Sequence, residues 1–146
     1  MYNKPKELSN EYAGMLMGLG LHGHLSALTI TKVFEHLSVS NEMVSIGIVL
    51  GMASSKRGTM DASVAKVLNI HIPALHPPSS TDLEVPPNLQ AAALLGVGLL
   101  YQGTADRRMT ELLLSEIGKK PLDHHFNREA YSLSAGLGLG LVTLGC

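Results

Sequence analysis

The sequence predicts an all-α fold built from tandem helical hairpins that form an arc of a solenoid. Glycine is abundant, with 15 of 146 residues, in a chain that is 45% hydrophobic and only 16% charged. Most of the glycines fall in four similar clusters, and a repeat spacing of about 20–50 residues is typical of arrays of supersecondary units. No stretch shows the sustained period-2 alternation of a half-buried strand. These three observations favour helices over strands throughout.

The four glycine clusters share one pattern. Each opens with a small residue, and a second small residue follows four positions later. A further glycine comes five or seven places after the second. The openings are Gly14, Gly47, Ala92 and Gly136, so the pattern recurs at a broadly similar interval. The clusters therefore read as an internal repeat: AGMLMGLGLHGHL, IGIVLGMASSKRGTM, AALLGVGLLYQGTA and AGLGLGLVTLGC.

Each cluster predicts a helix buried on most sides, because it is apolar nearly all round. Residues four apart share a helix face, so the small pairs form a narrow strip. Glycine inside a helix costs about 1 kcal/mol relative to alanine, which indicates that the strip admits a neighbouring backbone. The predicted packing glycines are Gly14, Gly18, Gly47, Gly51, Gly96, Gly136 and Gly140.

An amphipathic helix is expected after each of the first three clusters, since apolar residues recur at i, i+3, i+4 and i+7. The polar residues between them, including Glu116, are expected on the solvent side. The apolar stripes are Ile30, Val33, Phe34 and Leu37, then Met60, Val64, Val67 and Leu68, then Met109, Leu112, Leu113 and Ile117.

Two hinges and several helix starts can be read from single residues. Gly58-Thr59 and Gly103-Thr104 suit a left-handed residue that closes one helix and an N-cap that opens the next. The expected N-caps of the glycine-bearing helices are Asn10, Ser40 or Asn41, Asn88 and Asn127.

The chain is therefore expected to be one repeat domain, residues 1–146. Its repeats are about 10–40, 41–87 and 88–127, with half a repeat at 128–146. Residues 71–88 hold five of the seven prolines and are predicted to be non-helical. Residues 119–127 are expected to be a polar connector at the same edge of the array.

Composition excludes several classes of protein. A net charge of −1 gives no electrostatic reason to expect nucleic acid or an anionic membrane. No apolar run reaches the roughly 20 residues of a membrane span, and the N-terminus lacks the apolar core of a signal peptide. Cys146 is the single cysteine, which favours a reducing compartment.

The sequence motifs that could indicate cofactor or metal binding lack the context that such sites require. Gly18–Gly23 matches G-x-G-x-x-G with Glu42 downstream, but helical residues precede it where a dinucleotide fold requires a strand. His22, His24 and the His124-His125 pair have no cysteine partner other than Cys146 for a zinc site. The sequence therefore predicts no catalytic residue, no cofactor, no metal and no small-molecule substrate.

The Pro-rich segment has two interpretations. Loops longer than about 12–15 residues are usually functional or disordered, so this one is a candidate contact with a neighbouring subunit. Alternatively, the segment packs on its own repeat edge through Ile72, Leu75, Leu83 and Val85. The candidate contact residues are Pro77, Pro78, Ser79, Ser80, Thr81 and Asp82.

The glycine-strip hairpins resemble the proteasome/cyclosome repeat. This repeat occurs in the two largest non-ATPase subunits of the proteasome regulatory particle and in the largest subunit of the anaphase-promoting complex. The segments NEYAGMLMGLGLHGHL, HIPALHPPSSTDLEVP, LLGVGLLYQGTA and REAYSLSAGLGLG look specifically like the second of these families. The resemblance covers the chain from about Asn10 to its end.

The resemblance implies an α-helical toroid whose glycine-bearing helices form the inner ring. It also implies a non-catalytic scaffold of a cell-cycle ubiquitin ligase in the nucleus and cytoplasm, with other subunits as partners. A proteasome regulatory-particle scaffold is the alternative. A closed ring needs more than four repeats, and the last apolar helix lacks the polar cap that solenoid ends normally require. We therefore expect an excerpt of a larger subunit that, when isolated, self-associates or is only marginally stable.

Overall fold

The computed structural model describes residues 10–21, 41–77, 85–118 and 128–146. This part contains six α-helices, one 3-10 turn and no strand, so the predicted all-α class is confirmed. The predicted helix around Ile30–Leu37 lies outside the described residues. The elements are α1 (Asn10–Leu21), α3 (Glu42–Ser55), α4 (Ala62–Ile70), η2 (Pro73–Leu75), α5 (Pro87–Leu100), α6 (Arg107–Gly118) and α7 (Arg128–Val142).

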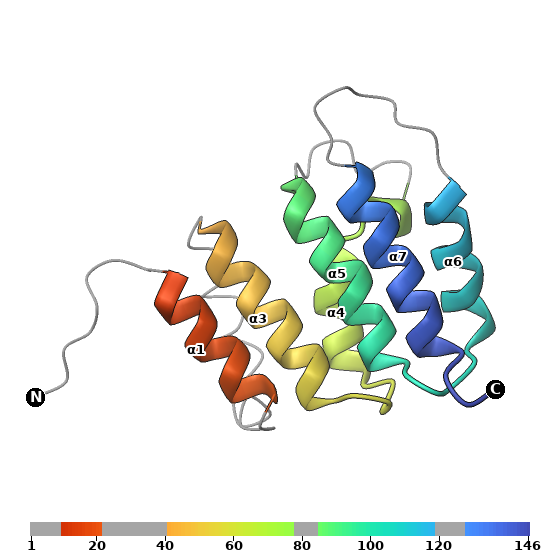
Figure 1. Cartoon of the computed structure of the whole chain (residues 1–146), viewed down its shortest axis with the longest axis horizontal. Coiled ribbons are helices and arrows are strands. Elements are labelled where there is room, and N and C mark those ends of the chain that lie inside the picture. The colour runs from red at the N-terminus through yellow and green to blue at the C-terminus, as the bar shows by residue number, and fades with distance from the viewer. Residues whose placement is uncertain (1–9, 22–40, 78–84, 119–127) are drawn as a thin grey trace, which may run out of the picture.

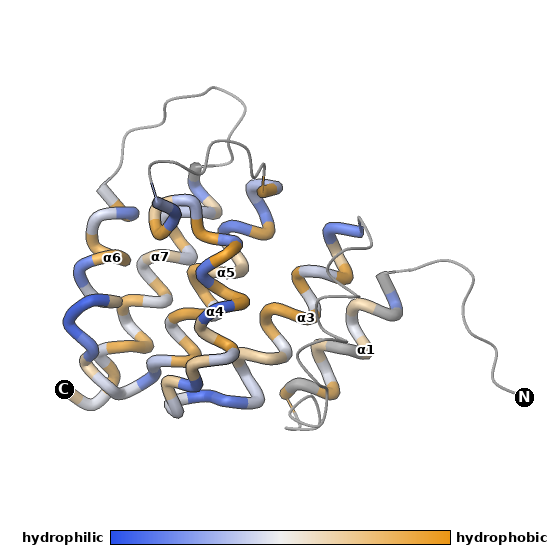
Figure 2. Tube along the Cα trace, turned by 180° about the vertical axis from the view of Figure 1, so that it is seen from behind, coloured by the Kyte–Doolittle hydropathy of each residue, from blue (hydrophilic) through white to orange (hydrophobic). Residues whose placement is uncertain are grey.

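The helices form two layers (Figure 1). The glycine-rich layer consists of α1, α3, α5 and α7, which lie side by side in chain order. The outer helices α4 and α6 lie behind it, and each packs mainly on the helix that follows it in the chain, α5 or α7. Figure 2 shows α5 as largely hydrophobic, whereas α6 carries hydrophilic turns on its outward side. This arrangement is the predicted tandem array of hairpins.

The core lies between the two layers. Its fully buried side chains include Ile48 from α3, Leu68 from α4, Leu94 from α5 and Leu113 from α6. Every layer contributes branched aliphatic residues, which bury apolar area with little loss of rotamer freedom. Burial of these side chains holds the outer helices against the glycine-rich layer.

The outer helices follow the predicted stripes with two exceptions. Val64, Val67 and Leu68 are buried in α4, but Met60 precedes that helix and is 47% exposed. In α6 the expected environments of two neighbours are exchanged, since Glu116 is 3% exposed and Ile117 is 36% exposed. The solvent position predicted for Glu116 is therefore wrong.

The first residues of the helices agree with one expected cap and differ from two other expectations, the cap of α5 and the extent of the non-helical segment. Asn41 caps α3 as predicted, because its Oδ1 accepts a hydrogen bond from the Val44 N–H at 3.1 Å. Asn88 does not cap α5, which begins at Pro87 without a side-chain cap. Proline suits the first helical position because its fixed φ is already helical and the missing N–H has no partner there. The segment predicted as non-helical therefore contributes its last two residues to α5, and a 3-10 turn, η2, forms inside it.

The hinge between α3 and α4 follows a short motif, Gly-Thr-x-Asp. Gly58 is left-handed as predicted, with φ 71°, and Met60 is a second left-handed residue with φ 54°. The Thr59 hydroxyl donates to the Lys56 carbonyl at 2.6 Å, so it closes α3 and does not open α4. Asp61 is the N-cap of α4 and accepts from two backbone N–H groups at 3.0 Å.

The hinge between α5 and α6 repeats this geometry. Gly103 and Ala105 are left-handed, with φ 70° and 51°. The Thr104 hydroxyl donates to the Tyr101 carbonyl at 2.7 Å, and Asp106 accepts from the Met109 N–H at 2.9 Å. The prediction that threonine caps the second helix is wrong at both hinges. In both hinges a left-handed residue stands on each side of the threonine, and the aspartate that follows caps the next helix.

Each hinge is hydrogen-bonded to the end of the next helix in the glycine-rich layer. The N–H groups of the two left-handed residues donate to two consecutive carbonyls there, and the pattern recurs. The bonds are Gly58 to Leu99 at 3.0 Å and Met60 to Leu100 at 3.2 Å, then Gly103 to Leu141 at 3.0 Å and Ala105 to Val142 at 3.0 Å. These bonds satisfy backbone groups that helix ends otherwise leave without a partner.

The recurring hinge sets the register between repeats. Gly145 is left-handed with φ 80°, so it corresponds to Gly58 and Gly103 of the earlier hinges. Counted back from these glycines, Gly138 stands before Gly145 at the same interval at which Gly96 stands before Gly103. The sequence pattern instead aligned the last repeat on Gly136 and Gly140. Its register there is therefore wrong by two positions.

Two glycine contacts between helices repeat in this register. A Cβ at Gly96 would lie 3.4 Å from Ala53 Cβ and 2.8 Å from Leu68 Cδ2. A Cβ at Gly138 would lie 3.0 Å from the Leu94 carbonyl and 3.3 Å from Leu113 Cδ2. In both cases an outer-helix leucine fills the space beside the glycine, and the preceding helix closes in on its other side.

The tightest contact joins α5 and α7 directly. A Cβ at Gly98 would overlap the Gly138 Cα, so the two backbones touch without a side chain between them. Gly47 makes a similar approach, since its Cβ would lie 2.5 Å from the Ala13 carbonyl oxygen of α1. Gly98 and Gly138 were not among the predicted packing residues, because the sequence pattern favoured pairs four apart.

The other predicted packing glycines differ in environment. Gly51 is buried. A Cβ at Gly14, Gly18, Gly136 or Gly140 would meet nothing within 4 Å. The packing role of these four residues stays a prediction.

Alanine substitutions at glycines should differ according to these contacts. We expect Gly98→Ala to lower the free energy of unfolding by about 1–3 kcal/mol, because backbone atoms cannot move aside as a side chain can. Gly96→Ala should cost less, since the Leu68 side chain can rotate away. Gly118→Ala is the control, because its Cβ would meet nothing within 4 Å. Denaturant unfolding followed by circular dichroism measures all three, and equal stabilities of G98A and G118A would contradict the assignment.

The aspartate of each hinge should matter more than the nearby surface carboxylate. Removing the N-cap with Asp106→Ala should cost about 1 kcal/mol of stability. Glu111→Ala removes only an exposed ion pair with Arg107, with Nε–Oε1 at 2.8 Å, and should cost about 0.5 kcal/mol or less. Thermal unfolding of the two variants compares them directly, and a larger effect for E111A would contradict the cap.

Candidate interaction surfaces

The described residues contain neither a candidate metal site nor a candidate membrane span. No group of three or more His, Cys, Asp or Glu side chains within residues 10–21, 41–77, 85–118 and 128–146 could hold a metal ion. Among the helices of this described part, none is long and apolar enough to cross a membrane. His22, His24, His124 and His125 lie outside the described residues.

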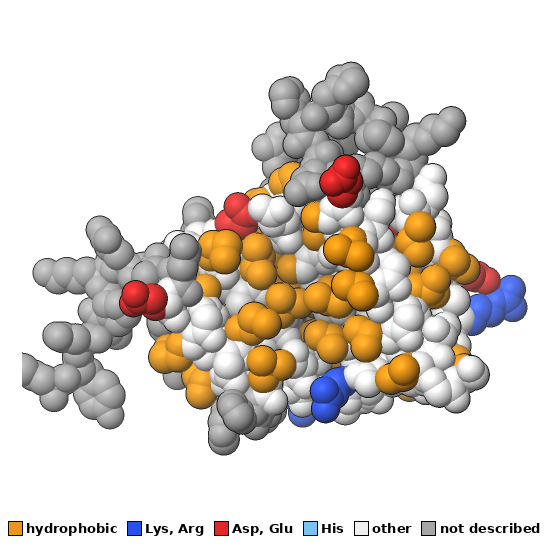
Figure 3. Space-filling model, viewed as in Figure 1, with side chains coloured by type: hydrophobic (Ala, Val, Ile, Leu, Met, Phe, Trp, Pro, Cys, Tyr) orange, Lys and Arg blue, Asp and Glu red, His pale blue; other side chains and the backbone are white. Residues whose placement is uncertain are grey.

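One face of the glycine-rich layer is apolar. α5 is covered by α3, α7 and α4, so its partly exposed Leu95 and Leu99 lie on the remaining side, away from the outer helices. Leu50 of α3 and Leu137 of α7 occupy the position of Leu95 in the hinge register. Figure 3 shows hydrophobic side chains spread continuously over α3, α5 and α7 on this side. The molecule therefore presents an apolar surface that spans several repeats.

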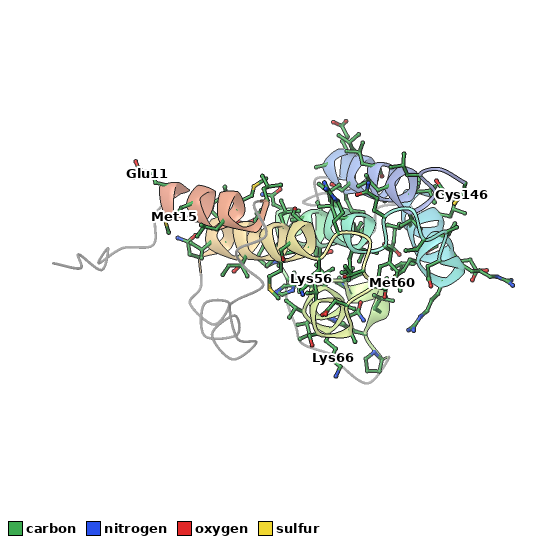
Figure 4. The ribbon with its side chains drawn as sticks, turned by 90° about the horizontal axis from the view of Figure 1, so that it is seen from below. Glu11, Met15, Lys56, Met60, Lys66 and Cys146 are labelled. Atoms are coloured by element: carbon green, nitrogen blue, oxygen red, sulfur yellow. The ribbon has the colours of Figure 1, made fainter. Side chains whose placement is uncertain are left out.

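This face is curved and lies between charges of opposite sign. Seen from below, α1 and α7 lie displaced from α3 and α5 toward the side away from α4, which makes the face concave (Figure 4). Glu11, Glu42 and Glu129 lie in the first turns of α1, α3 and α7. A carboxylate there interacts favourably with the positive end of the helix dipole. Lys56 and Arg57 follow the end of α3, at the opposite edge. Such a surface suits contact with polypeptide, since large exposed apolar patches mark interaction sites.

A buried polar pair joins α6 to α7. The Tyr131 hydroxyl donates a hydrogen bond to Oε2 of Glu116, and both residues are at most 5% exposed. Sequence reasoning missed this pair, because an acidic residue between apolar ones on a helix reads as a solvent position. The two residues belong to different helices, so no local signal connects them. The pair fixes the end of α6 to the start of α7.

Two histidines form hydrogen bonds with backbone carbonyls at the end of α4. The His71 Nδ1 lies 2.8 Å from the Val67 carbonyl oxygen, and the His76 Nε2 lies 2.8 Å from the Ile70 carbonyl oxygen. Each imidazole therefore donates an N–H to a carbonyl near the end of the helix. Burial lowers the pKa of His71, and the nearby His76 lowers it further, although the bond to Val67 opposes both effects.

The flanks of the Pro-rich segment are packed against the core. Ile72 is fully buried, Val85 is 8% exposed, and Leu75 packs partly buried against the core. Pro77 is exposed, and the rest of the candidate contact, residues 78–82, lies outside the described residues together with Leu83. The flanks thus behave as the self-packing interpretation expects, and the contact role of residues 77–82 stays a prediction.

Together, the fold and these surfaces define a class of protein: a helical-repeat array in which successive hairpins are joined through their backbones. Comparison with known families narrows the class. A family profile described as APC1 fifth domain matches residues 62–146, and one described as APC1 fourth domain matches residues 1–57. The chain belongs to the anaphase-promoting complex subunit 1 family. The two matches meet at the hinge between α3 and α4.

The curated relatives agree with this family. The chain is 55% identical over 150 residues to anaphase-promoting complex subunit 1 of Homo sapiens, and 54% identical over 146 residues to that of Dictyostelium discoideum. It is 39% identical to a protein of Emericella nidulans named negative regulator of mitosis. These matches cover 99% of this chain but only 8%, 6% and 7% of the relatives. The chain therefore spans less than a tenth of their length.

Acidification should loosen the end of α4. A histidine whose pKa is lowered by folding stays neutral in the native state and takes up a proton more readily when unfolded. Its contribution to stability is therefore present above the ordinary pKa of 6.5 and is lost as the pH falls below that value toward the native pKa.

The variant His71→Asn should flatten this pH dependence, because an amide N–H can replace the bond to Val67 without titrating. Urea unfolding at a series of pH values between about 7.5 and 5 compares it with wild type. His76→Asn is the matched control and should retain most of the slope. An unchanged slope in H71N would contradict the role given to His71.

Proposed function

We propose that the chain is a non-catalytic scaffold segment of a longer anaphase-promoting complex subunit, a cell-cycle ubiquitin ligase component that acts in mitosis. The observation that carries the proposal is the backbone-to-backbone joining of successive repeats at the hinges and at Gly98–Gly138. Such joints make a stiff curved array, which suits a part that holds other subunits in position. The family membership supports the assignment.

The functional partners on this proposal are other subunits of the same complex. The relatives' names describe subunits of the anaphase-promoting complex, and the concave apolar face offers area for polypeptide contact. Nucleic acid, membranes and small-molecule substrates are not among the proposed partners. We propose the nucleus and cytoplasm as its location, since cell division takes place there.

A second scaffold function, in a proteasome regulatory particle, is not favoured. The repeats alone are compatible with it, but both family profiles and the relatives named above point to the anaphase-promoting complex family or to mitosis. On this proposal, catalysis belongs to other subunits of the ligase.

Assembly of the complex tests the scaffold proposal. The full-length subunit would carry Gly98→Leu, which forces α5 and α7 apart, and Gly118→Ala serves as the matched control. We expect the G98L subunit to co-purify fewer partner subunits and to support less ubiquitin-chain formation, while the control behaves as wild type. Partners from the proteasome regulatory particle, or undiminished assembly with a folded G98L subunit, would contradict the proposal.

A further inference from the structure

The hinge between α3 and α4 exposes a large apolar side chain from a strained backbone position. Met60 is 47% exposed and left-handed, with φ 54°. A left-handed conformation is unfavourable for any residue that has a Cβ. The equivalent residue of the hinge between α5 and α6 is Ala105, with φ 51°. The hinge therefore requires the left-handed conformation but not a large side chain, so the exposed methionine needs a separate explanation.

Basic residues accompany Met60. From residue 43 to residue 77 the sequence has three basic residues, Lys56, Arg57 and Lys66, and Asp61 is the one acidic residue. The Asp61 carboxylate is used as the N-cap of α4. Figure 4 looks onto this edge and shows Lys56 and Met60 at the hinge, with Lys66 further along α4. The hinge end of this hairpin is therefore positive, although the whole chain has a net charge of −1.

The two hinge cations have no acidic partner within the part of the chain that the structure describes. The ion pair found there joins Arg107 to Glu111 on α6. Arg57 is exposed and Lys56 is partly exposed. We refer to Lys56, Arg57 and Met60 as the hinge surface, which combines two positive charges with one apolar side chain.

Hydrogen bonds hold the backbone of the hinge surface in place. The Met60 N–H donates to the Leu100 carbonyl of α5 at 3.2 Å. The Thr59 hydroxyl donates to the Lys56 carbonyl at 2.6 Å, and Asp61 closes the other end as the cap of α4. A ligand that binds to such a preorganised turn does not have to order it first, which favours affinity.

We propose that the hinge surface binds an acidic segment of another polypeptide, which places an apolar side chain against Met60. Carboxylates of the segment pair with Lys56 and Arg57, and the flexible thioether of methionine adapts to the apolar side chain. Nucleic acid is less suited to this surface, because the chain as a whole is not basic and an apolar side chain stands beside the cations. The inference rests on the scaffold function proposed above and names the chemistry of one partner.

A labelled peptide of Asp and Glu with one central Leu is the probe, titrated with the purified full-length subunit and followed by fluorescence anisotropy. We expect Lys56→Gln combined with Arg57→Gln to raise the dissociation constant about tenfold, since each exposed ion pair contributes little alone. Arg107→Gln combined with Arg108→Gln is the matched control, because it removes the same charge at the start of α6. Its affinity for the peptide should stay within about twofold of wild type.

A double-mutant cycle tests the apolar contact. Met60→Ala gives this hinge the residue type that stands at position 105 of the other hinge, so we expect the fold to be kept. Replacing the peptide's leucine by glutamine should weaken binding to wild type at least about threefold but should hardly change binding to M60A. Circular dichroism first checks that all variants are equally helical.

Several outcomes would overturn the inference. They are no binding of the peptide to the full-length subunit, an equal loss in the Arg107 and Arg108 control, or a leucine effect that persists in M60A. Tighter binding of a single-stranded oligonucleotide than of the peptide, lost in the Lys56 and Arg57 variant, would assign the surface to nucleic acid instead. Peptide binding does not require assembly of the complex, so this inference and the scaffold proposal, tested with G98L, can fail independently.

Discussion

Backbone contact between neighbouring helices of the glycine-rich layer is the constraint on which the rest of the structure depends. At Gly98 and Gly138 the backbones of α5 and α7 touch where any side chain would separate them. That approach brings the end of α7 within hydrogen-bonding distance of the hinge that follows α5. The hinge bonds in turn set the register between the described repeats that they join. A larger residue at the contact would therefore disturb both the packing and the hinges.

The outer helices depend on the same contact. Leu68 and Leu113 reach into the space beside Gly96 and Gly138, and they could not do so if those positions carried a side chain. The glycines thus serve two neighbours at once, the adjacent helix of the layer and the outer helix behind it. The cost of glycine in a helix, about 1 kcal/mol per position, is offset by this additional burial. A curved layer with an apolar concave face follows from repeating the unit.

The proposed scaffold role rests on this construction more than on any single residue. At the two described hinges, backbone hydrogen bonds join each unit to the next, and such joints suit a part that holds its neighbours in position. The concave apolar face and the charged edges then offer surface for contact, while the polar pair of Glu116 and Tyr131 joins α6 to α7 and the histidines satisfy carbonyls at the end of α4. Membership of the anaphase-promoting complex subunit 1 family supports the proposal that this segment is a scaffold.

Periodicity and the placement of glycine, proline and cap-forming residues determined the helical class, the repeated hairpins, the left-handed Gly58 and Gly103, and a cap of α3 at Ser40 or Asn41, because each depends on neighbours within one or two turns. Tertiary structure alone decided the register of the last repeat, since a helix with glycine at every second position is equally compatible with either alignment. It also decided the burial of Glu116, whose partner Tyr131 belongs to another helix, and the cap at Asp61, which requires a second left-handed residue that no local preference of methionine predicts. Which glycines touch a neighbour depended on the angle at which two helices meet, and that angle is a property of the whole packed layer.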